Sequence, residues 1–90
     1  MSSDVPSSVI ERAKGNEIRI TVRIGHEGVS ESLISEISSQ LAKRGMVKIK
    51  VNKGVLSNVT ERTDFFFKLA NKTDSEVVFQ RGNVFVLWSG

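Results

Sequence analysis

Two stretches of the chain alternate between apolar and polar residues with a period of two. Residues 17–24 carry an aliphatic side chain at every second position, namely Ile18, Ile20, Val22 and Ile24. Residues 46–53 repeat the pattern, with lysines between Val47, Ile49 and Val51. Successive side chains of a strand point to opposite faces of a sheet, so both stretches are predicted to be strands with one buried face.

Three further stretches have apolar residues at steps of three or four, which is typical of amphipathic helices. A short helix is expected at residues 7–14, before Gly15. A longer helix is expected at residues 30–44, with an apolar stripe made of Val29, Leu33, Ile34, Ile37 and Leu41. A third helix is expected to end near Lys72, with a stripe made of Val59, Phe66, Leu69 and Ala70.

Residues suited to helix ends flank the second and third stripes. Ser30 is a candidate N-cap of the second helix, and Gly45 can adopt the left-handed conformation that ends it. Asn58 and Glu61 have the spacing of a capping box for the third helix. These residues define the expected helix boundaries.

The last part of the chain predicts a hairpin, with β-type runs at residues 75–80 and 84–88 around a turn at 81–83. The complete order is a short N-terminal helix and then β-α-β-α-β-β. This order predicts an α/β fold: a single compact domain with a four-stranded mixed sheet and helices mainly on one face. The first two strands are expected to be parallel, because a helix connects them. Residues 1–6 are expected to be a flexible N-terminus and residues 7–90 the domain.

If the aliphatic residues of the first two strands point to the core, the basic residues between them must share the opposite face. These basic residues are Arg19, Arg23, Lys48 and Lys50. Exposed lysines could serve only to keep the sheet soluble and to discourage edge pairing. Their grouping with two arginines favours a surface for a polyanion, and RNA is the expected partner.

The amino-acid composition mainly excludes certain classes of site. The chain has 13 Lys and Arg against 10 Asp and Glu, a net charge of +3 that supports a polyanion partner only weakly. It has no cysteine, which excludes disulfides and cysteine-ligated zinc. No recognisable metal-ligand set or Ser-His-carboxylate arrangement is present, so neither a cofactor nor catalysis is expected. No signal peptide or membrane-spanning run is recognised, and a cytoplasmic location is expected.

A glycine loop made of Gly25, His26, Glu27 and Gly28 joins the first predicted strand to the second helix. Glycines allow close approach of an RNA backbone, and the first N–H groups of a helix can hold a phosphate, so the loop and Ser30 are candidate RNA-binding residues. The alternative is that the glycines serve only the conformation of the turn. His26 likewise could contact RNA or be a solvated turn residue. The loop lacks the Lys and Ser/Thr of a nucleotide-hydrolysing P-loop.

Three segments together resemble the CRM domain (chloroplast RNA splicing and ribosome maturation), whose stand-alone bacterial form is called YhbY. They are IGHEGVSE at residues 24–31, VKIKV at residues 47–51 and the closing region 73–88 with GNVFVLW. The resemblance covers residues 12–88. It implies a fold similar to the C-terminal domain of translation initiation factor three, and RNA binding through the glycine loop and the adjacent basic surface.

Members of this family associate with precursors of the large ribosomal subunit in bacteria and assist intron splicing in plants. The resemblance therefore implies ribosomal RNA or pre-ribosomal particles as the partner, with ribosomal proteins as further candidates. Family loops often carry a basic or small residue where this chain has His26 and Glu27. The basic N-terminal helix and C-terminal tail common in bacterial members are also reduced here, so a modest affinity is expected.

Three consecutive phenylalanines lie within the third predicted helix, and a rotation of about 100° per residue prevents them from facing one core. Phe66 is expected in the core, while an exposed Phe65 or Phe67 could stack on a base or dock a protein. Trp88 is expected to pack at the edge of the core. Two rivals to RNA binding stay open: a protein-interaction adaptor that uses exposed aromatics, and a DNA-binding chromatin protein that uses the basic face.

Overall fold

The helices and strands follow the order predicted from the sequence. The structure, a computed structural model, describes residues 5–15, 18–26, 28–52, 54 and 59–90. The elements are α1 (Ser7–Lys14), β1 (Ile20–Ile24), α2 (Glu31–Arg44), β2 (Met46–Val51), α3 (Val59–Lys72), β3 (Glu76–Arg81) and β4 (Val84–Trp88). The predicted α/β class is confirmed.

The four strands form one mixed sheet in the order β1-β2-β4-β3. β1 and β2 are parallel neighbours, as expected for two strands joined through a helix, while β4 is antiparallel to both β2 and β3. A two-residue turn joins β3 to β4, and Gly82 in this turn has a positive φ of 58°. β2 and β4 therefore occupy the centre of the sheet.

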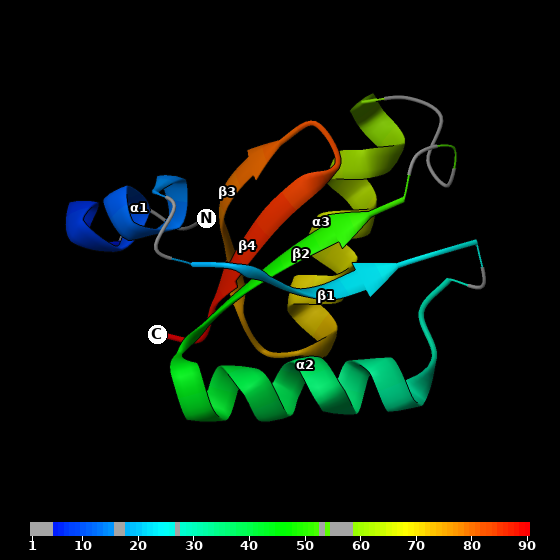
Figure 1. Cartoon of the computed structure of the whole chain (residues 1–90), viewed down its shortest axis with the longest axis horizontal. Coiled ribbons are helices and arrows are strands. Elements are labelled where there is room, and N and C mark those ends of the chain that lie inside the picture. Colours follow the sequence, from blue (N-terminus) through cyan, green and yellow to red (C-terminus); the bar gives the residue numbers. More distant parts are fainter. Residues whose placement is uncertain (1–4, 16–17, 27, 53, 55–58) are drawn as a thin grey trace.

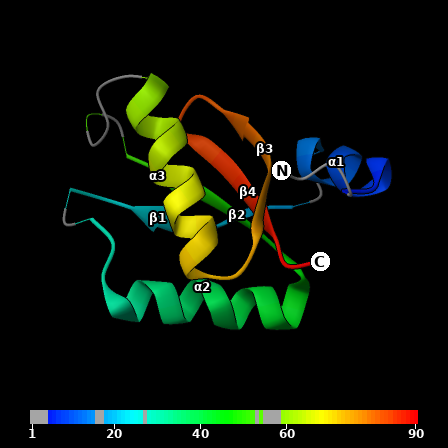
Figure 2. The same ribbon diagram turned by 180° about the vertical axis from the view of Figure 1, so that it is seen from behind.

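Helices α2 and α3 pack against the same core, on one face of the sheet. α3 lies behind the sheet in Figure 1 and in front of it in the reversed view of Figure 2. The rings of Phe66 on α3 and Phe85 on β4 stack with their centroids 4.0 Å apart. The buried members of this core are Val22, Ile24, Ile37, Leu41, Val47, Ile49, Val51, Phe66, Leu69, Ala70, Phe85 and Leu87. We call the opposite side of the sheet the open face.

α1 lies apart from the other two helices and contacts β3 (Figure 1). Its buried side chains Val9 and Ala13 form a second, smaller cluster with Met46 and Val86 from the two central strands. Even-numbered residues of β2 and β4 alternate with the core residues, so this cluster lies on the open face. Part of the open face is therefore covered by α1.

The predicted alternation of the first strand is wrong in its first half. Val22 and Ile24 point to the helices as expected, but Ile18 and Ile20 lie on the open face. The cause is a register shift: Ile20 pairs with Lys48, whereas Val22 pairs with Ile49, so that Thr21 is an extra residue in β1. A bulge of this kind reverses the direction of every side chain that precedes it.

The expected ends of α2 are confirmed. The Leu33 N–H donates a hydrogen bond to Ser30 Oγ at 3.1 Å. Gly45 has a φ of 78° and its N–H donates to the Leu41 carbonyl at 2.7 Å. The capping-box prediction for α3 involves Asn58, which lies outside the described residues.

The aromatic predictions are confirmed as well. Phe66 is fully buried, whereas the side chain of Phe67 is 52% exposed. Phe65 is half-buried and meets the Phe66 ring edge-on at a centroid distance of 6.3 Å. Trp88 is half-buried against the cluster beneath α1, which is the edge packing expected for it.

Candidate nucleic-acid interface

Strand β2 separates apolar from basic side chains. Its odd-numbered residues are buried beneath α2 and α3, while Lys48 and Lys50 are half-buried on the open face. Arg23 of β1 is exposed and is the register partner of Lys50. Neighbouring residues on parallel strands point to the same side of a sheet, so Arg23 and Lys50 place two positive charges next to each other.

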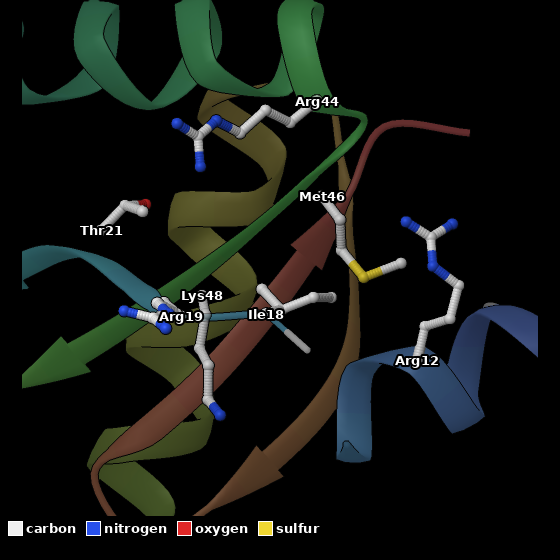
Figure 3. Close-up of a pocket in the computed structure, with 7 residues that line it drawn as sticks. All are labelled: Arg12, Ile18, Arg19, Thr21, Arg44, Met46 and Lys48. Carbon is white, nitrogen blue, oxygen red and sulfur yellow. The ribbon is translucent and has the colours of Figure 1, made fainter. Parts of the chain in front are cut away.

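Arg19 lies just before β1, and its position differs from that expected of a regular strand. It lines a hollow of about 360 Å³ at the β1 edge of the sheet, between α1 and the end of α2, which we call the arginine hollow. The described residues that line this hollow are Arg12, Ile18, Arg19, Thr21, Arg44, Met46 and Lys48. Figure 3 shows that Arg12 comes from α1 and Arg44 from the end of α2, with Ile18 and Met46 between them.

A second hollow, of about 210 Å³, lies on the other side of Lys48. We call it the Phe79 hollow, and its described lining is Lys14, Ile20, Lys48, Phe79, Arg81 and Val84. No acidic residue is among the described residues that line either hollow. Lys48 belongs to both hollows, so the two form neighbouring depressions on one basic surface.

The glycine loop begins where β1 ends, beside Arg23 and Lys50. The Gly28 N–H donates a hydrogen bond to the Gly25 carbonyl at 3.0 Å, which closes a tight turn. Gly28 has a φ of 80°, in the left-handed region that favours glycine, whereas Gly25 does not have a positive φ. The conformation of the turn therefore requires glycine at position 28 but not at position 25.

The loop after β2 touches the glycine loop, because both follow the carboxyl ends of parallel neighbours. The Asn52 N–H donates to the Ile24 carbonyl at 2.8 Å. A Cβ added to Gly25 would lie 3.6 Å from Asn52 Nδ2, and one added to Gly54 would lie 3.7 Å from the exposed ring of His26. Both distances are ordinary van der Waals contacts. Glu27, the remaining predicted residue of the loop, lies outside the described residues.

Ser30 is the N-cap residue of α2. Its hydroxyl already accepts the Leu33 N–H, so its part in the site is to fix the start of α2 at the end of the loop. The first amides of the helix have no acceptor within the helix and remain suited to an anion.

Acidic side chains gather elsewhere. Glu31 and Glu36 lie together on the outer side of α2 with three serines, Ser32, Ser35 and Ser39. This side does not contribute to either hollow. This acidic side of α2 is therefore separate from the two basic hollows.

Of the four predicted basic residues, Arg23, Lys48 and Lys50 lie on the open face, whereas Arg19 meets Lys48 only at the arginine hollow. The structure also adds cations that the sequence analysis missed. Arg12 and Arg44 join the arginine hollow, and Lys14 and Arg81 join the Phe79 hollow. The sequence predicted α1 as a short helix, but not the sheet face that receives its buried side chains Val9 and Ala13. Because the sequence did not show where α1 docks, it could not show that Arg12 and Lys14 line the hollows.

Among the residues that the structure describes, no group of three or more His, Cys, Asp or Glu side chains could hold a metal ion. Within the part of the chain that the structure describes, no helix is long and apolar enough to cross a membrane.

Taken together, the fold and the site define a small α/β domain whose sheet presents a basic open face that ends in a glycine loop. The chain belongs to the CRS1/YhbY (CRM) domain family, whose family model matches residues 11–89. The family resemblance found in the sequence is thereby confirmed.

The chain is also similar to one protein in sequence and to another in fold. The chain is 39% identical over 77 residues to a protein of Methanocaldococcus jannaschii named "Probable RNA-binding protein". The match covers 86% of this chain and 56% of the relative, so the chain spans little more than half of the relative's length. The fold is similar to the solution structure of a hypothetical Staphylococcus aureus protein described as an RNA-binding candidate. The TM-score is 0.73 at 22% identity, and the match covers 96% of this chain and 88% of that one.

Proposed function

We propose that the chain is a non-catalytic RNA-binding module that binds structured RNA, in the first place ribosomal RNA or its precursor during ribosome assembly. The observation that carries the proposal is the position of the glycine loop. The loop starts at the end of β1, two residues after Arg23, whose register partner is Lys50, so that the glycine turn and two cations meet at one end of the open face. Family membership and the name of the archaeal relative support RNA as the polyanion.

In this proposal, binding is directed at phosphates. Gly25 and Gly28 let the RNA backbone approach the start of α2, and His26 and Glu27 are the other candidate RNA-binding residues of the loop. The cations that hold neighbouring phosphates are Arg19, Arg23, Lys48 and Lys50. Phosphate contacts fix position and orientation but do not read sequence, so specificity is expected to come from the shape of the RNA.

A salt titration tests the electrostatic part of the proposal. Neutralising roughly four to six phosphates gives a log-log slope of affinity against salt of about −3 to −5. The measurement is fluorescence anisotropy with a labelled ribosomal RNA hairpin over a range of potassium chloride concentrations. Affinity that does not change with salt would contradict the proposal. Competition with duplex DNA at equal salt separates RNA binding from the DNA-binding alternative.

Crosslinking in cells, followed by sequencing of the bound RNA, identifies the partner. Reads concentrated in precursor ribosomal RNA are expected. Scarce or evenly scattered reads would remove ribosome assembly from the proposal.

One observation favours a second candidate, a protein-interaction adaptor. Phe67 is a large apolar side chain that is 52% exposed on α3, on the opposite side of the sheet from the open face. A partner retained by the wild-type protein after nuclease treatment, but lost on Phe67→Ser substitution, would support this function.

A further inference from the structure

The arginine hollow and the Phe79 hollow are built from parts of the chain that the glycine loop does not use. Each is lined by cations together with apolar side chains. The arginine hollow has three guanidinium groups and Lys48 around Ile18 and Met46 (Figure 3). The Phe79 hollow has Lys14, Lys48 and Arg81 around an aromatic ring and two aliphatic side chains.

This combination fits an unpaired nucleotide better than a simple anion. Guanidinium and ammonium groups hold the phosphate, and guanidinium planes and aromatic rings offer surfaces on which a base can stack. A paired base is already stacked within its helix and cannot enter such a hollow. The lack of carboxylates among the described lining residues leaves the positive charge available to a phosphate.

We infer that the two hollows bind consecutive unpaired nucleotides of a single-stranded RNA segment that runs from the glycine loop across the open face to α1. The inference rests on the proposed function, because it extends the same RNA beyond the loop. β2 runs along this path with six residues, a length of roughly 17–20 Å for a strand of that size. Loops of the GxxG type clamp about four nucleotides, so a longer unpaired segment is needed to reach the hollows.

Two RNA probes test the inference: a blunt RNA hairpin, and the same hairpin with an unpaired 3′ or 5′ extension of about eight nucleotides, within the site sizes usual for single strands. The wild-type protein is expected to bind an extended hairpin about tenfold or more tightly than the blunt one, since each stacked base contributes substantially. Affinity is measured by anisotropy at one salt concentration.

The variant Arg12→Ala/Arg44→Ala removes two cations from the arginine hollow. It is expected to lose most of the advantage of the extension and to bind the blunt hairpin like the wild type. The control Lys68→Ala/Lys72→Ala removes the same charge from α3, on the other side of the sheet, and is expected to keep the advantage. Phe79→Leu examines the other hollow: it keeps an apolar side chain but removes the stacking ring, and a several-fold loss confined to the extended hairpin is expected.

The outcomes separate the inference from the proposed function. Equal binding of blunt and extended hairpins by the wild type would overturn the inference and leave the proposed function in place. An equal loss in the α3 control would also overturn it, because net charge alone would then explain the effect. Absence of binding to either hairpin would overturn the proposed function itself.

Discussion

The two ends of the open face are basic for different reasons. At the loop end, the important feature is the backbone: a tight turn between Gly25 and Gly28, next to Arg23 and Lys50. At the α1 end, the important feature is a set of cations that come from α1, the chain before β1, the end of α2 and β2. The loop end is formed mainly by residues close together in the sequence, whereas the α1 end exists only because distant elements pack together.

The structure of each end also depends on different contacts. The loop end depends on the conformation of one turn and on two neighbouring strands. The α1 end depends on the small cluster of Val9, Ala13, Met46 and Val86, which is separate from the main core. A change in this cluster should therefore disturb the hollows without unfolding the domain.

The largest expected effect comes from Lys48→Glu with Lys50→Glu, because Lys50 lies at the loop end and Lys48 lines both hollows. Hydrogen bonds to charged groups contribute about 1.5–3 kcal/mol each, so the loss of two should weaken RNA binding by about 3–6 kcal/mol, on the order of 100- to 10,000-fold. Anisotropy measures the affinity, and circular dichroism checks that the fold is retained. The matched control is Lys68→Glu with Lys72→Glu. Unchanged binding by the β2 variant would place the RNA site elsewhere.

Ala13→Leu tests the α1 end separately from the loop end. Ala13 is fully buried between α1 and the sheet, and overpacking of a buried site costs about 1–3 kcal/mol of unfolding free energy. Leucine leaves the net charge unchanged, so weaker binding of the extended hairpin would report the displacement of α1. Hydrogen exchange should show lost protection in α1 but retained protection in β2 and β4. Equal loss of protection in the central strands would show that the two clusters are not independent.

Two substitutions in the glycine loop distinguish a glycine needed for the turn conformation from a glycine needed for close approach of RNA. Gly28→Ala should lower the free energy of unfolding by about 1–2 kcal/mol, because a side chain is strained at a φ of 80°. Gly25→Ala has no such strain and meets only an ordinary contact, so its stability should stay within about 0.5 kcal/mol of the wild type.

If RNA approaches this loop closely, Gly25→Ala should nevertheless weaken binding several-fold. Chemical denaturation and anisotropy on the same preparations give both quantities. Wild-type affinity in Gly25→Ala would support the alternative that the glycines serve only the turn.

The smallest effect is expected for Phe67→Ser, which lies outside both ends of the open face. The side chain is 52% exposed, so both the free energy of unfolding and the RNA affinity should change by no more than about 0.5 kcal/mol. Thermal denaturation and anisotropy check these values. A clear loss of RNA affinity would extend the interface to α3.

Much of the fold could be predicted because local patterns agreed with the final packing. Period-two alternation identified β2 correctly, and the apolar spacing of α2 and α3 matched their buried sides. Ser30 and Gly45 were identified as helix ends because capping depends on neighbouring residues only. The first strand was predicted less well. Its sequence alternates without interruption, and the bulge at Thr21 arises from pairing with β2.

The sequence by itself thus determined the order of elements, the main core, the glycine loop and the basic character of β2. Only the tertiary structure decided that Ile18 and Ile20 face the open side, and that Arg12, Lys14, Arg44 and Arg81 surround Lys48. The physical reason is the range of the interactions. Capping, turns and alternation act between residues a few positions apart, whereas the hollows require a strand register and the docking of α1, which depend on contacts between distant parts of the chain.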